Sequence, residues 1–295
     1  MILVTGGTGF VGSHIVNALA DAGKDVRVLE RKPGSWQQAG VRCREAVQGD
    51  MTDPESLRRA VAGCDTAVHL VAVRQGKPEQ FQRVMSDGTR DLVAAAKEAG
   101  VHRFVLMSAL GTTDETKDLV PYYRAKWDME QTVNGSGLDH VIFRPTFIFA
   151  RDGGILPTFR RLAKLMPVTP IPGSGTQRIQ PIWIDDLVAY FVKAIDLDAA
   201  TNRLFEVGGP DKVTWNELWD RLKQALGTRR PSVHVPMGVM RAQAVVLERL
   251  PGNIPVTRDL LKMMEAGDNV VSDDEAVRTF GLPLVPLDEQ LRRAA

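Results

Sequence analysis

The chain has 295 residues, of which 25% are charged and 44% hydrophobic, proportions that exclude a collagen, a coiled coil and a mainly disordered chain. Its 37 Lys and Arg against 36 Asp and Glu give a net charge of +1, so bulk electrostatics do not favour a nucleic-acid partner. Two cysteines are too few for a disulfide scaffold, no apolar run is long enough for a membrane span, and we expect a cytoplasmic protein without a leader peptide.

The first half of the chain alternates short apolar runs with amphipathic stretches. The runs predict strands at residues 2–5, 25–29, 46–48, 65–71, 103–107 and 140–143. The stretches predict helices at residues 11–22, 54–61, 79–99 and 120–133. Asp53 before Pro54 is a typical helix N-cap. Strands and helices that alternate so regularly indicate a Rossmann-type α/β fold with a doubly wound parallel sheet.

The pattern changes after residue 150, where prolines and glycines become frequent. The later elements that we expect are a strand at 180–184, a helix at 185–195 opened by Asp185 and Asp186, a strand at 204–207, and helices with capping boxes at Thr214 and Ser272. The apolar residues of 237–247 could form an exposed lid, a partner surface or part of the core, and we favour the core.

These elements predict two parts. A dinucleotide-binding domain is expected at residues 1–150, completed by about 178–207. A smaller, mostly helical subdomain for substrate or partner is expected at 151–177 and 208–295.

A glycine-rich loop follows the first predicted strand and opens the first helix. In the loop sequence TGGTGFVG, Gly6 permits a tight turn, Gly9 lets a pyrophosphate approach the backbone, and Gly12 lets the helix pack closely on the strand. The amide N–H groups and the dipole of the helix then favour the phosphates. The loop residues expected to contact a dinucleotide are Gly6, Thr8, Gly9, Phe10, Val11 and Gly12.

The residues after the second predicted strand bear on which dinucleotide is bound. Glu30 could accept hydrogen bonds from both ribose hydroxyls, which favours NAD. Arg31 and Lys32 could hold a 2′-phosphate, provided that the Glu30 carboxylate turns away. We favour NADP slightly and keep NAD as the alternative.

The spacing of these glycines resembles that of the short-chain dehydrogenase/reductase superfamily, in its extended and atypical branches. The segments that carry the resemblance are the glycine loop, Gly49-Asp50-Met51-Thr52-Asp53, Leu70-Val71-Ala72, the Tyr122 and Lys126 pair, Arg144-Pro145-Thr146, Gln180-Pro181 and Gly208-Gly209-Pro210. The resemblance covers nearly the whole chain. It implies cofactor contacts from Asp50, Met51, Leu70, Val71, Ala72, Met107, Lys126, Arg144, Pro145 and Thr146.

Tyr122 and Lys126 are the YxxxK pair of that superfamily. Residues four apart share one face of a helix, so both side chains can reach one site. A nearby ammonium favours the phenolate, which would let Tyr122 act as acid or base while hydride moves between the cofactor and a carbonyl or alcohol. Ser108 is the third catalytic candidate, as a residue that lines the site.

Departures from the superfamily pattern leave the function open. Ala109 stands at the usual catalytic serine position, and Met85 at the usual asparagine position. This pattern resembles the atypical group typified by the NADPH-binding accessory subunit of respiratory complex I. The alternatives to an oxidoreductase are therefore a non-catalytic NAD(P)H-binding subunit or redox sensor of a larger assembly and, with less support, a nucleotide-sugar epimerase or dehydratase.

Other site types have little support in the sequence. The five histidines lack the paired spacing of zinc ligands, so we expect no metal site, and His69 is expected to be a core residue. The substrate is an unknown small molecule. A homodimer or a larger respiratory-type assembly, which could also bring the protein to a membrane surface, is the expected kind of partner.

Overall fold

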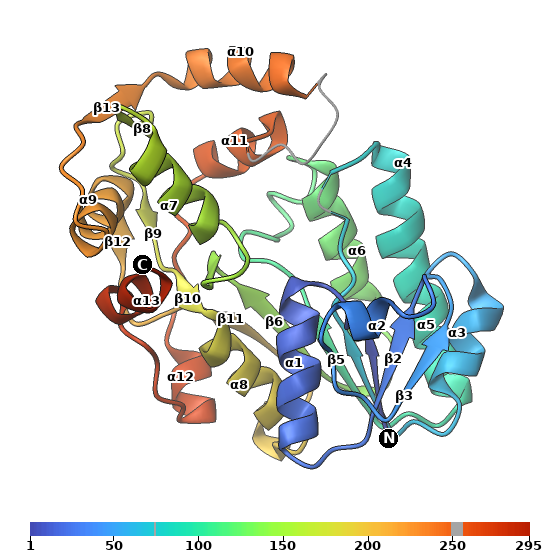
Figure 1. The fold of residues 1–295 in the computed structure, drawn as a ribbon. Coiled ribbons are helices and arrows are strands. Elements are labelled where there is room, and N and C mark those ends of the chain that lie inside the picture. The colour runs from blue at the N-terminus through green and yellow to red at the C-terminus, as the bar shows by residue number, and fades with distance from the viewer. Residues whose placement is uncertain (74, 249–255) are drawn as a thin grey trace. The chain divides into compact units, whose positions relative to one another are not determined.

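The computed structural model describes residues 1–73, 75–248 and 256–295, and its chain forms two compact units (Figure 1). The first unit comprises Met1–Pro145, Leu187–Glu206 and Asp273–Leu282. The second comprises Thr146–Asp186, Val207–Ser272 and Pro283–Ala295. The first unit thus includes the segment 273–282, which is far along the chain from its other parts.

A seven-stranded sheet, in the order β11-β6-β5-β4-β1-β2-β3, is the centre of the first unit. Its strands are β1 (Ile2–Thr5), β2 (Val26–Glu30), β3 (Glu45–Gln48), β4 (Thr66–His69), β5 (Arg103–Met107), β6 (Asp139–Pro145) and β11 (Arg203–Val207). Neighbouring strands from β6 through β3 are paired in parallel. The predicted Rossmann-type fold is confirmed, because the strand order reverses between β1 and β4.

Helices cover both faces of this sheet. They are α1 (Phe10–Asp21), α2 (Ser35–Gln38), α3 (Pro54–Val61), α4 (Pro78–Phe81), α5 (Gly88–Glu98), α6 (Pro121–Asn134), α8 (Ile184–Ala194), η2 (Asp198–Ala200) and α12 (Glu275–Phe280). Leu3, Phe104 and Ile142 of the strands share a buried cluster with α3, α5 and α6. On β6, Phe143 packs against Phe191 of α8, with 4.8 Å between the ring centroids.

Phe280 explains why the segment 273–282 belongs to the first unit. Its ring lies 5.6 Å from that of Phe143, 5.1 Å from that of Tyr190 and 5.1 Å from that of Phe205, measured between centroids. One aromatic side chain thereby completes the core beside β6 and β11. Nothing in the sequence around Phe280 indicates that its side chain packs into the core of the first unit.

The helix predicted at 79–99 is interrupted. A π-helical turn, η1 (Gln82–Asp87), separates α4 from α5. In this turn the Met85 sulfur accepts a hydrogen bond from the Val73 amide, with N–S 3.2 Å, and the Ser86 hydroxyl donates to Asp128 of α6, with O–O 3.0 Å. Tertiary contacts of this kind stabilise a π turn, and turns of this kind are often found at functional sites.

Of the helix N-caps predicted from the sequence at Asp53, Thr214 and Ser272, the first two are present in the structure. Asp53 caps α3 by accepting hydrogen bonds from the amides of Glu55 and Ser56, as predicted. The capping box at Thr214 is also confirmed. The one at Ser272 is wrong: α12 begins after Asp274, and the Glu275 amide donates to the Asp273 carboxylate.

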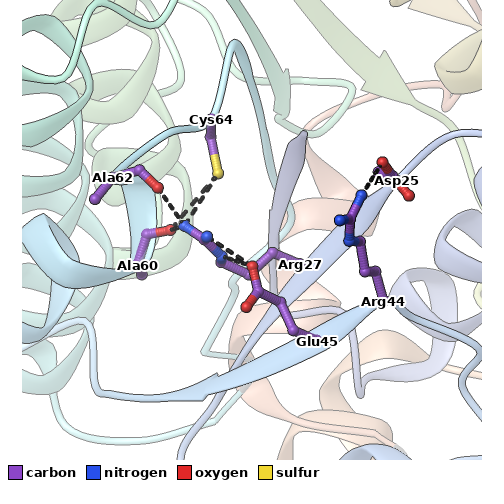
Figure 2. A network of polar contacts seen from close by, with 7 residues as sticks. All are labelled: Asp25, Arg27, Arg44, Glu45, Ala60, Ala62 and Cys64. Atoms are coloured by element: carbon purple, nitrogen blue, oxygen red, sulfur yellow. Dashed lines mark hydrogen bonds and ion pairs between the residues drawn. The ribbon is translucent and has the colours of Figure 1, made fainter.

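Arg27 ties three elements of the first unit together at the edge of the sheet (Figure 2). From β2 its guanidinium donates to the carbonyl oxygens of Ala60 and Ala62, at 2.8 and 2.6 Å, and to Glu45 of β3, at 2.7 Å. The Cys64 sulfur lies 3.4 Å from the same guanidinium. A cation at the carboxyl end of α3 satisfies carbonyls that the helix itself leaves unpaired.

The second unit is mostly helical, with three two-stranded sheets. Its helices are α7 (Leu156–Leu165), α9 (Trp215–Ala225), α10 (Met237–Leu247), α11 (Arg258–Glu265) and α13 (Leu287–Ala294). Its strands are β7 (Ile148–Phe149), β8 (Thr169–Pro172), β9 (Arg178–Ile179), β10 (Ile182–Trp183), β12 (Val213–Thr214) and β13 (Ser232–Val235). The core includes Phe159, Trp215 and Trp219, whose rings are in contact.

Of the strand predicted at 180–184, only Ile182–Trp183 forms a strand, β10, and Gln180 and Pro181 separate it from β9. The buried Gln180 side chain donates to the Gly209 carbonyl, at 2.7 Å, and accepts from the Val271 amide, at 3.0 Å. We expected Asp185 and Asp186 to cap the N-terminus of α8, but both lie within its first turn. Asp185 accepts from the Trp183 indole, and Asp186 accepts from the Val285 amide.

Candidate functional site

The glycine loop joins β1 to α1. Gly6 has a φ of +75°, a left-handed conformation that favours glycine, and a Cβ there would lie 3.0 Å from the Val71 nitrogen and 3.1 Å from the Leu70 carbonyl carbon. Leu70, Val71 and Ala72 follow β4, so their backbone runs beside the loop. This arrangement brings together two of the segments that the sequence predicted for the cofactor.

The first turn of α1 is suited to an anion. Its N-cap is Gly9, which has no side chain to satisfy the amide N–H groups, and the turn contains no acidic residue. A helix leaves these N–H groups without intrahelical partners, and its dipole places positive charge there. Gly12 lies so close to the loop that a Cβ would be 2.1 Å from the Gly6 carbonyl oxygen. The loop therefore fits a pyrophosphate at Phe10, Val11 and Gly12.

Glu30, at the end of β2, is committed to its own loop. Its carboxylate accepts hydrogen bonds from the amides of Gly34 and Trp36, at 3.1 and 3.2 Å, and from the Ser35 hydroxyl, at 2.9 Å. Burial raises the pKa of the Glu30 carboxyl, but these hydrogen bonds outweigh it and leave the pKa below its ordinary value. The carboxylate is thus bound by its own loop, whereas Arg31 and Lys32 are exposed.

Asp50 and Met51 follow β3. The Asp50 carboxylate accepts from the amide and the hydroxyl of Thr52, at 2.9 and 2.8 Å, which fixes the turn. Met51 is buried, and Gly88 of α5 packs on it so closely that a Cβ would lie 2.8 Å from the Met51 carbonyl oxygen. The adenine-side contacts that we predicted for this pair remain predictions.

His69 is a buried, neutral core residue, as expected. Because the Thr89 hydroxyl donates to the Met85 carbonyl, it must accept from Nε2 of His69, at 2.9 Å, and Nδ1 then accepts from the Thr5 hydroxyl, at 2.6 Å. Burial, aided by the charge of Lys126, lowers the pKa of His69 to about 3. The imidazole therefore cannot act as an acid or base near neutral pH.

Tyr122 and Lys126 lie on one face of α6. Lys126 is fully buried, its ammonium donates to the Met107 carbonyl at the end of β5, with N–O 2.6 Å, and its nitrogen lies 5.8 Å from the centre of the half-buried Tyr122 ring. Burial lowers the pKa of Lys126 to about 8, against the opposing effect of the Glu130 carboxylate. The geometry places a cation where it can act on the Tyr122 phenol.

The adjacent Tyr123 has a structural role. It is buried, its hydroxyl donates to the Leu110 carbonyl, at 3.3 Å, and a Cβ on Gly111 would meet that hydroxyl at 2.5 Å. Burial raises the pKa of Tyr123 to about 12. Of the two neighbouring tyrosines, only Tyr122 faces Lys126.

Two hydroxyl groups after β5 are buried without a hydrogen-bond partner among the described residues. They are the hydroxyls of Ser108, which is 2% exposed, and Thr112, which is 0% exposed. An unsatisfied buried hydroxyl costs about 1–3 kcal/mol, so a ligand or water that pairs with it is stabilised. Ser108 follows the Lys126-bound Met107 directly, which fits its predicted place at the site. Thr112 was not identified from the sequence, because threonine in a loop carries no distinguishing pattern.

Arg144, for which we predicted a cofactor contact, forms an ion pair with an acid of α6. Its guanidinium donates to both carboxylate oxygens of Glu130 on α6, at 2.9 and 2.6 Å, and the two side chains are only 12% and 1% exposed. The next residue, Pro145, accepts a hydrogen bond from the Leu110 amide. Thr146 belongs to the second unit, where its hydroxyl donates to the Gln180 carbonyl, at 2.6 Å.

We expect Glu130→Ala to lower the free energy of unfolding by about 3–5 kcal/mol, because it leaves the Arg144 charge buried and unpaired. Urea denaturation measures the change. The matched control is Glu55→Ala, which removes one partner of the exposed Arg58–Glu55 pair and should cost at most about 1 kcal/mol. Equal effects of the two substitutions would show that the Glu130–Arg144 pair does not stabilise the fold.

No group of described residues that could hold a metal ion is present, and no described helix is long and apolar enough to cross a membrane. The site is thus built from backbone amides, hydroxyls, one phenol and one buried ammonium. These groups suit an anionic dinucleotide beside a proton donor.

Comparison with known proteins agrees with this geometry. A family model described as NAD(P)H-binding matches residues 6–161. The ceramide reductase of Caulobacter vibrioides is 31% identical over 83% of this chain and 77% of its own length. Subunit 9 of the mitochondrial NADH dehydrogenase [ubiquinone] 1 alpha subcomplex of Arabidopsis thaliana is 25% identical over 96% of this chain and 73% of its own length.

Among solved structures, an NADPH-dependent quinone oxidoreductase of Escherichia coli, complexed with NADPH, superposes with a TM-score of 0.80. It is 18% identical, and the match covers 99% of this chain and 98% of that one. At this identity the similarity supports the fold.

Proposed function

Because the chain belongs to the NAD(P)H-binding family of atypical short-chain dehydrogenases/reductases, we propose that it is an NADPH-dependent reductase of a carbonyl compound. Tyr122 is the proton donor to the carbonyl oxygen, and Lys126 sets the acidity of that phenol. The bound nicotinamide coenzyme supplies the hydride. Ser108, whose buried hydroxyl has no partner in the described part of the chain, forms a hydrogen bond to the substrate or the coenzyme.

The preference for NADPH rests on one observation, the engagement of Glu30. A carboxylate held by Gly34, Ser35 and Trp36 offers little to the ribose hydroxyls of NADH. The three donors also offset part of the Glu30 negative charge that would otherwise repel a 2′-phosphate. Arg31 and Lys32 then supply the positive charge that such a phosphate requires.

We expect calorimetry to give a Kd for NADPH at least about tenfold below that for NADH, which is about 1.4 kcal/mol. In Arg31→Ala/Lys32→Ala this difference should vanish, because only NADPH loses affinity. The matched control is Glu30→Gln, which keeps an acceptor for the loop amides and should leave NADH affinity unchanged. Equal affinity for both coenzymes in the unmodified protein would contradict the preference, and binding of neither would contradict the function.

A second function keeps the cofactor site but not the reaction. Ala109 and Met85 at the usual serine and asparagine positions support a non-catalytic NADPH-binding subunit, and the similarity to the Arabidopsis respiratory subunit agrees with it. A homodimer or a larger assembly belongs to this second proposal. Turnover separates the two, because a reductase oxidises NADPH in the presence of a suitable ketone, whereas a subunit only binds it. Because one relative is a ceramide reductase, ketones that carry acyl chains are the first probes to use.

A further inference from the structure

Two segments of the second unit share an unusual composition. Residues 156–172 and 227–247 carry six basic residues and no acidic one, although acids and bases are nearly equal in number over the whole chain. The basic residues are Arg160, Arg161, Lys164, Arg229, Arg230 and Arg241. Such a separation of charge within a nearly neutral protein indicates a local surface that attracts anions.

The same segments hold most of the exposed apolar side chains. Among the described residues, seven large hydrophobic side chains are exposed, and Val277 alone lies outside the two segments. The other six are Leu165 (67%), Met166 (42%), Val233 (45%), Val239 (48%), Val245 (37%) and Leu247 (39%). The expectation that 237–247 forms core is therefore wrong for most of α10, where Ala244 is the one described side chain that is fully buried.

Contacts hold the two segments side by side. Strand β8 pairs with β13 in parallel, from Thr169 opposite Ser232 to Pro172 opposite Val235. At the entry to both strands, the Arg230 guanidinium donates to the carbonyl oxygens of Lys164, at 2.8 Å, and Met166. The exposed Leu165 and Met166 thus lie beside the loop that carries Arg229.

We propose that this basic–apolar surface, formed by Lys164, Leu165, Met166, Arg229, Val233 and the exposed side of α10, docks the protein on an anionic lipid bilayer. Aliphatic side chains enter the boundary between headgroups and acyl chains, while the basic side chains remain at the phosphates. Of the acids nearby, Asp220 is paired with Lys223, at 3.0 Å, Glu248 with Arg258, at 2.6 Å, and Glu265 with Arg241. These acids leave no uncompensated negative charge, and in the described part of the chain the basic residues of the two segments without such a pair are Arg160, Arg161, Lys164, Arg229 and Arg230. The surface needs no membrane-spanning helix.

The sequence of the paired strands argues against a second copy of this chain as the occupant. Pro231 and Pro236 bracket β13, and Pro170 and Pro172 lie within β8. Proline has no amide hydrogen and blunts a strand edge against further pairing. Nucleic acid is also a poor match, because its phosphates would be bound by the cations but would leave six aliphatic side chains in water.

The test is co-sedimentation of the full chain with vesicles of phosphatidylcholine alone or mixed equally with phosphatidylglycerol. We expect binding to the mixed vesicles, weakened by salt. Lys164→Glu/Arg229→Glu should lower the affinity at least about 25-fold, since each basic residue near an anionic surface contributes about fivefold. Leu165→Asp/Met166→Asp should abolish binding, and NADPH affinity should be unchanged in all variants.

Control variants make changes of the same kind in the first unit. Arg44→Glu/Arg58→Glu alters the net charge equally at exposed positions, and Val277→Asp places an acid on an exposed valine. Both should bind vesicles like the unmodified chain. The proposal is overturned if mixed vesicles do not bind, if the control variants lose binding equally, if only a DNA duplex is retained, or if the apolar variants instead dissociate a dimer. NADPH calorimetry tests the proposed reductase separately.

Discussion

Replacing Tyr122 with phenylalanine is expected to lower kcat for ketone reduction by about a hundredfold to ten-thousandfold, the contribution of a positioned general acid. The substitution removes only the phenol oxygen and keeps the ring whose centre lies 5.8 Å from the Lys126 nitrogen. NADPH affinity should therefore stay unchanged. Steady-state kinetics and calorimetry on the same preparation measure both quantities.

The neighbouring tyrosine supplies the matched control. Tyr123→Phe removes a hydroxyl of the same kind one residue along the helix, where it only donates to the Leu110 carbonyl. We expect its kcat to fall by less than about tenfold and its stability by about 1 kcal/mol. If both variants turned over at the rate of the unmodified protein, Tyr122 would not be the proton donor.

The pH profile adds a second readout of the same pair. Burial lowers the pKa of Lys126 to about 8, so the ammonium that acts on Tyr122 is lost as the pH rises through that value. The rate of ketone reduction is expected to fall above about pH 8. Stability changes in the opposite sense: between about pH 8 and the ordinary lysine value of 10.5 the unfolded chain binds more protons, so the free energy of unfolding rises with pH. Lys126→Met should remove that rise.

Replacing Gly12 with alanine is expected to weaken NADPH binding by at least about a hundredfold, or about 2.7 kcal/mol. The new Cβ would lie 2.1 Å from the Gly6 carbonyl oxygen and 2.8 Å from the Gly7 Cα, and both are backbone atoms that cannot rotate away. The loop must shift from the first turn of α1, which removes the amides that a pyrophosphate requires. We also expect a loss of about 1–3 kcal/mol in the free energy of unfolding.

Gly238→Ala is the control for this substitution. Gly238 lies in α10, and a Cβ built there meets no atom within 4 Å. Alanine favours the helix, so stability should rise slightly or stay constant, and NADPH binding should be unchanged. An unaltered NADPH affinity in Gly12→Ala would show that the first turn of α1 is not the phosphate site.

Local patterns predicted the elements of the first unit because their signals lie within a few residues. The strands at 2–5 and 103–107 and the helix at 54–61 match β1, β5 and α3 to the residue. Asp53 caps its own helix through backbone amides two and three positions ahead. The glycine loop could be recognised for the same reason, since Gly6, Gly9 and Gly12 act on one short turn.

The tertiary structure shows protein partners for several residues for which the sequence predicted cofactor contacts. Glu30 binds its own loop, Met107 accepts from Lys126 through its backbone carbonyl, and Arg144 pairs with Glu130. A family motif identifies the residue at a position but not the partner of its side chain. A long polar side chain such as that of Arg144 pairs with the charged group that the fold places beside it. Glu130 carried no signal of its own in the sequence, although it is the charged partner of Arg144.

The amino-acid sequence by itself determined the fold class, the dinucleotide loop and the Tyr122–Lys126 pair, because each depends on spacing along one strand, turn or helix. Only the tertiary structure decided that the Tyr122 ring lies near the buried Lys126 ammonium and that Glu30 is bound by its own loop. It also decided where the π turn interrupts the helix and which apolar residues of 237–247 are exposed. These outcomes depend on contacts between residues far apart in the chain. The free energy of each contact depends on how deeply it is buried, and the burial is known only once the chain has folded.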